Sequence, residues 1–121
     1  MNVQKFEDLI IWQKSQNIAV NIYNLFKSTK EFAFRDQIFR AAISISNNIA
    51  QGFNRETNKE FIRFLYISRA SCSEVKSMLY LSVKIGLITD EFAQKYILDC
   101  DEINRIGFSL IKKLKLIIEK G

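Results

Sequence analysis

The chain has 121 residues, a length at which a single domain buries about two-thirds of its unfolded surface around one core. Apolar residues make up 48% and charged residues 26%, which excludes intrinsic disorder, and the absence of proline disfavours β-rich and loop-rich folds. The formal net charge of +5 favours polyanions in general and specifies no partner.

The first helix is expected over residues 7–28. Apolar residues recur at spacings of three and four from Phe6 to Phe26, and polar residues 27–30 end the pattern. The second helix is predicted over residues 34–52, where an apolar stripe runs from Phe34 to Ile49. Gly52 follows that stripe, and we expect it to end the helix as a left-handed C-cap.

The third helix is predicted over residues 58–85. The sequence from Thr57 to Glu60 has the form of a capping box, and Gly86 suits a C-cap at the other end. The fourth helix is expected over residues 90–119, capped by Thr89 or Asp90. Its first half is acidic and its last half basic, which matches the helix macrodipole.

Long helices joined by short connections predict an all-α domain over residues 1–121, an antiparallel up-down-up-down four-helix bundle. The first and fourth helices also carry a second set of apolar positions, which makes their apolar arcs wider than one bundle seam requires. This set includes Ile11, Ile18, Ile97, Ile111 and Ile118. The extra width predicts oligomerisation.

Cellular location follows from what the sequence lacks. Residues 1–6 show no positive region followed by an apolar run, and no 18-residue stretch is free of charge, so neither a secretory signal nor a membrane span is expected. Cys72 and Cys100 lie in apolar helical stretches and are expected to be small buried hydrophobes. We therefore expect a cytoplasmic protein.

The residues needed for most catalysis are missing. The chain has no histidine, and its glycines are isolated from one another, so neither the commonest general base nor a phosphate loop is present. We expect no enzyme activity, cofactor, metal or small-molecule substrate. The acidic side chains near the start of the fourth helix are expected to complement the helix dipole; they are Asp90, Glu91, Asp99, Asp101 and Glu102. An enzyme that uses these carboxylates is the remaining catalytic alternative, and a metal bound at Asp99 or Asp101 would favour it.

Two surfaces are candidates for binding. A polar strip on the second helix is either a solvated face or a contact surface for another subunit or for nucleic-acid phosphates; it consists of Gln37, Arg40, Ser44, Asn48 and Gln51. Further on, cations flank aromatic residues, as nucleic-acid surfaces often show. These cations are Arg55, Lys59, Arg63 and Arg69, around Phe61, Phe64 and Tyr66. The alternative is that the aromatic residues pack inward and leave ordinary solvated charges.

Several segments carry a more specific signal. They are Phe6-Glu7-Asp8-Leu9 with Trp12, residues 37–42, Ser44-Ile45-Ser46-Asn47-Asn48-Ile49-Ala50-Gln51-Gly52, Arg55, and Glu60-Phe61-Ile62-Arg63-Phe64-Leu65. Together they resemble the proteins encoded in intervening sequences of bacterial 23S ribosomal RNA genes, over nearly the whole chain. The resemblance implies a four-helix bundle that forms a ring-like homopentamer with a basic surface and no established catalytic activity. It also implies kinship with the accessory variability determinant of diversity-generating retroelements, a similar pentamer that binds a reverse transcriptase and nucleic acid.

The chain departs from the family pattern at three positions. Phe39 stands where an arginine is usual, Ser46 where a proline is usual and Gln51 where a glutamate is usual. The resemblance therefore transfers no polyanion contact to position 39, whereas Arg40, Asn48, Arg55 and Arg63 match.

We expect a non-catalytic homo-oligomeric scaffold, a pentamer, that binds RNA, DNA or a nucleic-acid-processing partner through a basic surface. Its candidate contacts are Arg40, Asn48, Arg55, Lys59, Arg63 and Arg69. The alternative is a purely protein-binding or structural module with no nucleic-acid role.

Overall fold

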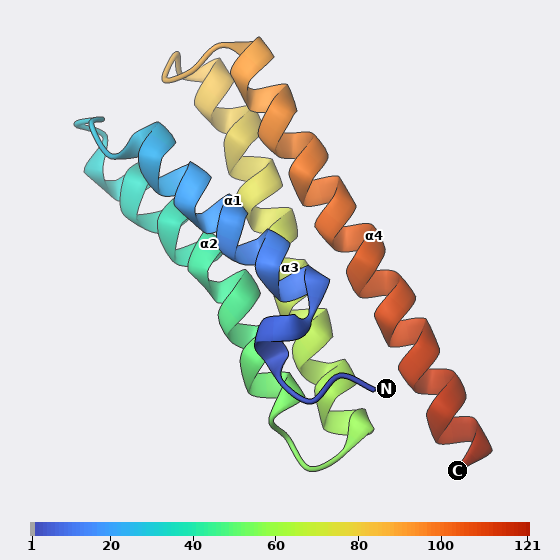
Figure 1. Cartoon of the computed structure of the whole chain (residues 1–121). Helices are drawn as coiled ribbons and strands as arrows, with labels where there is room; N and C mark the ends of the chain where they lie inside the picture. The colour runs from blue at the N-terminus through green and yellow to red at the C-terminus, as the bar shows by residue number, and fades with distance from the viewer. Residues whose placement is uncertain (1) are drawn as a thin grey trace.

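The computed structural model describes residues 2–121, which form one short 3-10 helix and four long α-helices (Figure 1). The elements are η1 (Phe6–Asp8), α1 (Ile10–Phe26), α2 (Phe32–Phe53), α3 (Asn58–Lys84) and α4 (Asp90–Lys120). No strand occurs in the described range, so the all-α prediction is confirmed. The helices lie side by side as a bundle, with the α1–α2 and α3–α4 connections at one end and the α2–α3 connection at the other.

The start of the first helix differs from the prediction. Leu9 adopts an extended conformation with ψ of 125°, which separates η1 from α1. The Leu9 side chain is buried, the Phe6 and Trp12 rings meet edge to face at 5.3 Å, and the Gln13 amide donates to the Glu7 carbonyl. These contacts fold the N-terminal turn back onto α1, and tertiary packing therefore overrides the helical spacing that predicted a continuous helix from residue 7.

Two of the four glycine and cap predictions, those for Gly86 and Thr89, are confirmed. The capping box is confirmed on its Thr57 side only, because the Glu60 carboxylate pairs with Arg55 and Arg63 and accepts no bond from the Thr57 amide among the described residues. The Thr57 hydroxyl accepts from the Glu60 amide, Thr89 accepts from the Phe92 amide, and Gly86 has φ of +80° after α3. The C-cap prediction for Gly52 is wrong, because α2 continues through it to Phe53. Gly52 instead marks a close approach of α2 to α3.

The core runs the length of the bundle and is built from isoleucine and leucine. Ile22, Ile38, Leu65, Leu79 and Leu114 are among its fully buried side chains. Cys72 and Cys100 are also buried, as predicted, and the Cys72 thiol donates to the Cys100 carbonyl at 3.3 Å. The hydrogen bond with Cys72 and burial both raise the pKa of the Cys100 thiol.

The second apolar set of the first and fourth helices belongs mainly to this same core. Ile11, Ile18, Ile97 and Ile111 are at most 3% exposed, whereas Ile118 is 45% exposed. These first four residues therefore give no support for oligomerisation, because the monomer itself buries them. Among the described residues, no helix combines the length and the apolar character that a membrane crossing requires.

Candidate nucleic-acid interface

The predicted polar strip of α2 lies along its seam with α3. The Ser44 and Ser71 hydroxyls are 2.8 Å apart, and the Asn48 amide donates to both the carbonyl and the hydroxyl of Ser44. Gln37 donates to Glu74 across the same seam. Two residues of the strip, Gln37 and Ser44, therefore bond to α3, and both amide hydrogens of Asn48 are used within α2.

Arg40 lies on the exposed edge of this seam. Its guanidinium donates to the Gln37 side-chain oxygen at 2.9 Å and has no ion pair among the described residues. The charge of Arg40 is thus available to solvent, although Gln37, its hydrogen-bond partner, also donates to the carboxylate of Glu74.

Arg55 and Arg63 come together at the end of the bundle where α2 connects to α3. Both pair with Glu60, at 3.6 Å and 2.9 Å, and both lie over the Phe64 ring, 5.5 Å and 4.9 Å from its centroid. The hydrogen bond from Arg63 lowers the pKa of Glu60. The arginine side chains remain 50% and 58% exposed, and Lys59 beside them is exposed too. This end offers fixed cations, partly neutralised by Glu60.

Arg69 lies on another side of α3, about 140° around the helix from Phe64. Its stem crosses α4 at Gly107, where an added Cβ would come within 3.2 Å of the Arg69 Cγ. Its guanidinium sits over the Phe108 ring at 5.5 Å. This places the head of Arg69 in a groove of about 520 Å³ between α3 and α4, lined also by Asp101, Asn104, Arg105, Phe108 and Ser109.

The six predicted contact residues therefore do not form one surface. Arg55, Lys59 and Arg63 gather at the α2–α3 connection, and Arg40 lies roughly 20 Å away along α2. Arg69 faces α4 instead. Of the two interpretations for the aromatic residues, inward packing holds for Phe61, which is 4% exposed, whereas Tyr66 is 46% exposed.

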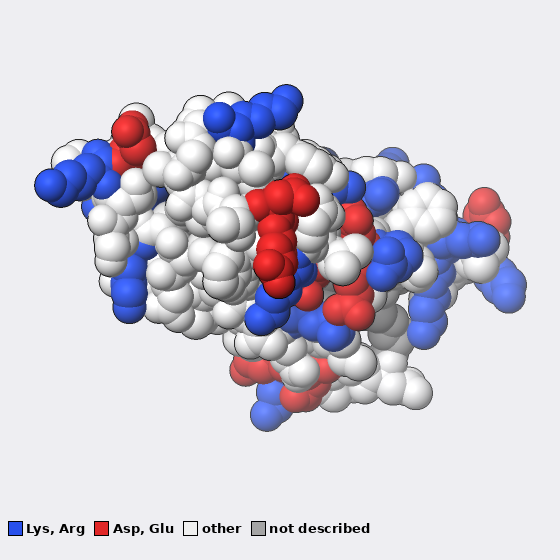
Figure 2. Space-filling model, turned by 90° about the horizontal axis from the view of Figure 1, so that it is seen from above, with Lys and Arg blue, Asp and Glu red and all other residues white. Residues whose placement is uncertain are grey.

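A basic surface that sequence reasoning missed lies on the C-terminal half of α4. Residues 103–121 carry Arg105, Lys112, Lys113, Lys115 and Lys120 against Glu119 alone. Lys115 donates to the Tyr66 hydroxyl of α3 at 3.0 Å. Figure 2 looks onto the end of the bundle where α4 begins, which carries mixed charges and much uncharged surface. Lysine and arginine are more frequent toward the right of this view, and Figure 1 places the C-terminus of α4 on that side.

The acidic half of α4 ties helices together. Asp101 pairs with Lys76 of α3 at 2.7 Å, and Glu102 pairs with Lys14 of α1 at 2.9 Å. Burial and the neighbouring Glu102 raise the pKa of Asp99. Within residues 2–121, no three histidine, cysteine or acidic residues are grouped in a way that would hold a metal ion.

Comparison with known proteins identifies the family. The profile of the 23S rRNA-intervening sequence protein family matches residues 7–109. The chain belongs to this family. A solved structure of a protein of unknown function from the S23 ribosomal protein family of Bacteroides thetaiotaomicron is 33% identical, with a TM-score of 0.81 over 85% of this chain and 99% of that one. No curated protein matches the chain.

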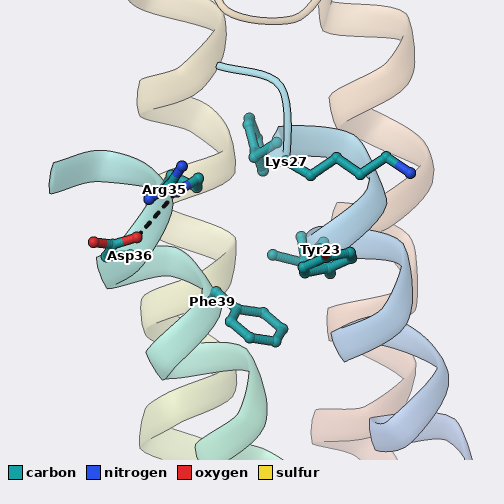
Figure 3. A pocket seen from close by; sticks show the side chains of 7 residues that line it. Tyr23, Lys27, Arg35, Asp36 and Phe39 are labelled. Atoms are coloured by element: carbon teal, nitrogen blue, oxygen red, sulfur yellow. Dashed lines mark hydrogen bonds and ion pairs between the residues drawn. The ribbon is translucent and has the colours of Figure 1, made fainter. Parts of the chain in front are cut away.

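This member of the 23S rRNA-intervening sequence protein family also has an apolar groove between α1 and α2. Tyr23 and Phe39 face one another across it with ring centroids 5.5 Å apart, and the Arg35–Asp36 pair stands above them (Figure 3). Val20 and Ile43 continue the groove along the two helices, and both are exposed. Phe39, one of the departures from the family pattern, thus contributes apolar surface here.

Proposed function

We propose that this family member is a non-catalytic, homo-oligomeric scaffold that binds RNA or DNA through a basic surface. In this proposal the antiparallel up-down-up-down bundle is the protomer of a pentamer. The observation that carries the proposal is the gathering of lysine and arginine on the C-terminal half of α4, beside Arg69 of α3. The absence of histidine from the chain supports a binding role over acid-base catalysis.

The macrodipole of α4 accounts for only a small part of this basic surface. Its effect on cations falls off within the last turn of a helix. α4 ends at Lys120, so Lys112 and Arg105 stand two and four turns before that end. The macrodipole therefore does not explain why cations occur at these two positions, and attraction of a polyanion does.

Self-assembly is supported by the apolar groove between α1 and α2. Val20, Tyr23 and Ile43 are 57%, 51% and 36% exposed, which is a contiguous apolar surface of the kind that another protein chain covers. The same groove favours the second candidate function, a purely protein-binding or structural module. In that case the positive charge would aid solubility alone.

The first experiment measures the absolute mass by light scattering after size exclusion, at low and high salt. A pentamer gives about 70 kDa, five times the 14.1 kDa of one chain. A mass of one chain at all concentrations would overturn the homo-oligomeric part of the proposal.

The second experiment measures binding of a fluorescent single-stranded RNA by anisotropy at several salt concentrations. If about four phosphates are neutralised, the slope of log affinity against log salt is about −3. The double variant Lys112→Glu with Lys113→Glu should abolish binding, whereas Lys84→Glu, a control on α3 away from this surface, should leave most of it. No binding at low salt would favour the protein-binding alternative.

A further inference from the structure

Two of the residues that line the groove between α3 and α4 each have one buried polar atom without a partner. These atoms are the Arg69 Nε, whose N–H is a donor, and the Asn104 Oδ1, an acceptor. Within the described residues, no other buried side-chain nitrogen or oxygen is unpaired. Buried polar groups in folded proteins nearly always find a partner, because leaving one unpaired destabilises the fold. Two such atoms of opposite character therefore need partners from outside the chain, an acceptor for Arg69 and a donor for Asn104.

The walls of the groove restrict what that ligand is. Phe108 is 56% exposed and presents a flat aromatic face beside the Arg69 guanidinium. Arg105 contributes a further exposed charge, and Lys112 follows Phe108 one turn later on the same face of α4. The carboxylate of Asp101, which also lines the groove, is paired with Lys76. The groove is therefore cationic and aromatic, with a volume of about 520 Å³ that falls within the usual range for small-molecule and cofactor sites.

An unpaired nucleobase has all the required features. Its edge carries a hydrogen-bond donor next to an acceptor, its faces stack on aromatic rings and guanidinium groups, and its phosphates are attracted by the cations along the rim. A backbone phosphodiester alone would satisfy Arg69 but offers no donor to the Asn104 oxygen. An apolar side chain would leave both atoms unpaired.

We propose that the α3–α4 groove binds one unpaired base of a single-stranded nucleic acid, stacked on Phe108 and hydrogen-bonded at its edge by Arg69 and Asn104. This inference rests on the proposed nucleic-acid function and adds a mode of recognition to it. Tyr66 of α3, which is exposed and accepts a hydrogen bond from Lys115 of α4, offers a second aromatic face to the neighbouring base.

Gly107 is part of the same construction. A Cβ at this position would lie 3.2 Å and 3.4 Å from the Arg69 Cγ and Cδ, so the glycine lets the arginine stem lie flat across α4. That placement leaves the Arg69 head beside Phe108. Arg69 therefore combines a packed stem with a charged head at the groove, as long cationic side chains commonly do.

The test compares two oligonucleotides of equal length and charge, an oligoadenylate and an abasic ribose-phosphate chain, binding to the full-length protein at fixed salt. The proposal expects the base-bearing strand to bind about tenfold tighter. Phe108→Leu and Asn104→Leu should each remove most of that difference. Phe92→Leu should retain it, because Phe92 is an equally exposed phenylalanine of α4 outside the groove.

The outcomes separate this inference from the proposed function. Equal binding of both strands by the wild type would overturn base recognition and leave backbone binding in place. Binding of neither strand at low salt would overturn both. A preference for bases that survives in Phe108→Leu and Asn104→Leu would place the base elsewhere and overturn the assignment to this groove. A change in oligomeric mass on Asn104→Leu, without any change in base preference, would make the groove an interface between copies and would equally overturn it.

Discussion

Phe64 of α3 occupies the space into which a side chain at Gly52 of α2 would have to point. A Cβ added to Gly52 would lie 2.5 Å from the Phe64 Cβ and 3.0 Å from a ring carbon of Phe61. Gly52 is fully helical, and among the glycines only Gly86 has a positive φ. The glycine therefore sets the distance between α2 and α3, and it does so next to the ring on which Arg55 and Arg63 lie.

Gly52→Ala should lower the free energy of unfolding by about 1–3 kcal/mol, because the two helix backbones must move apart. Alanine gains about 1 kcal/mol of helix propensity over glycine, which reduces the loss without reversing it. Urea unfolding measures the change. Gly86→Ala is the comparison: nothing lies within 4 Å of its added Cβ, so it loses about 1 kcal/mol through φ alone. Unchanged or increased stability of Gly52→Ala would contradict the close approach.

The buried thiol of Cys100 makes stability depend on pH in the alkaline range. Its pKa is raised in the folded state, so the folded protein keeps a proton that the unfolded chain releases above its ordinary thiol pKa. The contribution of the protonated Cys100 thiol to the free energy of unfolding is therefore fully present below the ordinary thiol pKa of about 8.5. As the pH rises above that value, the free energy of unfolding falls by at most about 1.4 kcal/mol per pH unit.

Urea unfolding at pH 8 and pH 10 tests this dependence in the wild type and in Cys100→Ala. The variant keeps the backbone carbonyl that accepts from Cys72, so that hydrogen bond remains. Its stability should fall less steeply between the two pH values. Identical slopes would mean that other groups, such as tyrosine and lysine, cause the alkaline loss.

Local signals with one physical cause were predictable from the sequence. Thr57 satisfies a free amide within its own helix turn, and Gly86 follows the apolar pattern that it ends. Position 52 is glycine for a different reason, because Phe64 of α3 lies too close to leave room for a side chain. That closeness depends on how the two helices pack. A single sequence does not distinguish these two uses of glycine.

The candidate site was predictable only in part for the same reason. Arg55 and Arg63 are close in sequence to Phe64, so their gathering follows from helical spacing. The groove that joins Arg69 to Asn104 and Phe108 requires the register between α3 and α4, which residue spacing within either helix does not fix. The excess of lysine in the second half of α4 was the available signal, and the macrodipole explanation concealed it.

Glu60→Gln should strengthen RNA binding by about twofold to fivefold, because it removes the carboxylate that pairs with Arg55 and Arg63. Anisotropy titration at low salt measures the change. Glu56→Gln is a matched control: it deletes the same charge in the same connection, and no ion pair of Glu56 occurs among the described residues. Equal gains in both variants would indicate a general charge effect and no special role for this arginine pair.

Arg40→Glu should leave the helical content unchanged, because the exposed side chain gives up a single hydrogen bond to Gln37. It should weaken RNA binding or assembly, since the new carboxylate joins Glu74 at the edge of the seam. Circular dichroism, anisotropy and light scattering report on the three properties. Wild-type values in both binding and mass would remove Arg40 from the interface.

Tyr23→Glu should lower the oligomeric mass toward that of one chain. The side chain lines the α1–α2 groove and is 51% exposed, so the monomer tolerates the charge while an apolar interface would have to bury it unpaired. Tyr80→Glu is the control, because this α3 tyrosine is 46% exposed and lies outside the groove. An unchanged mass for Tyr23→Glu would exclude the groove as the assembly surface. Apolar contacts resist salt, whereas contacts to phosphates do not. An oligomer that persists at high salt after RNA is released would therefore assign assembly to the α1–α2 groove and RNA binding to the basic surface of α4.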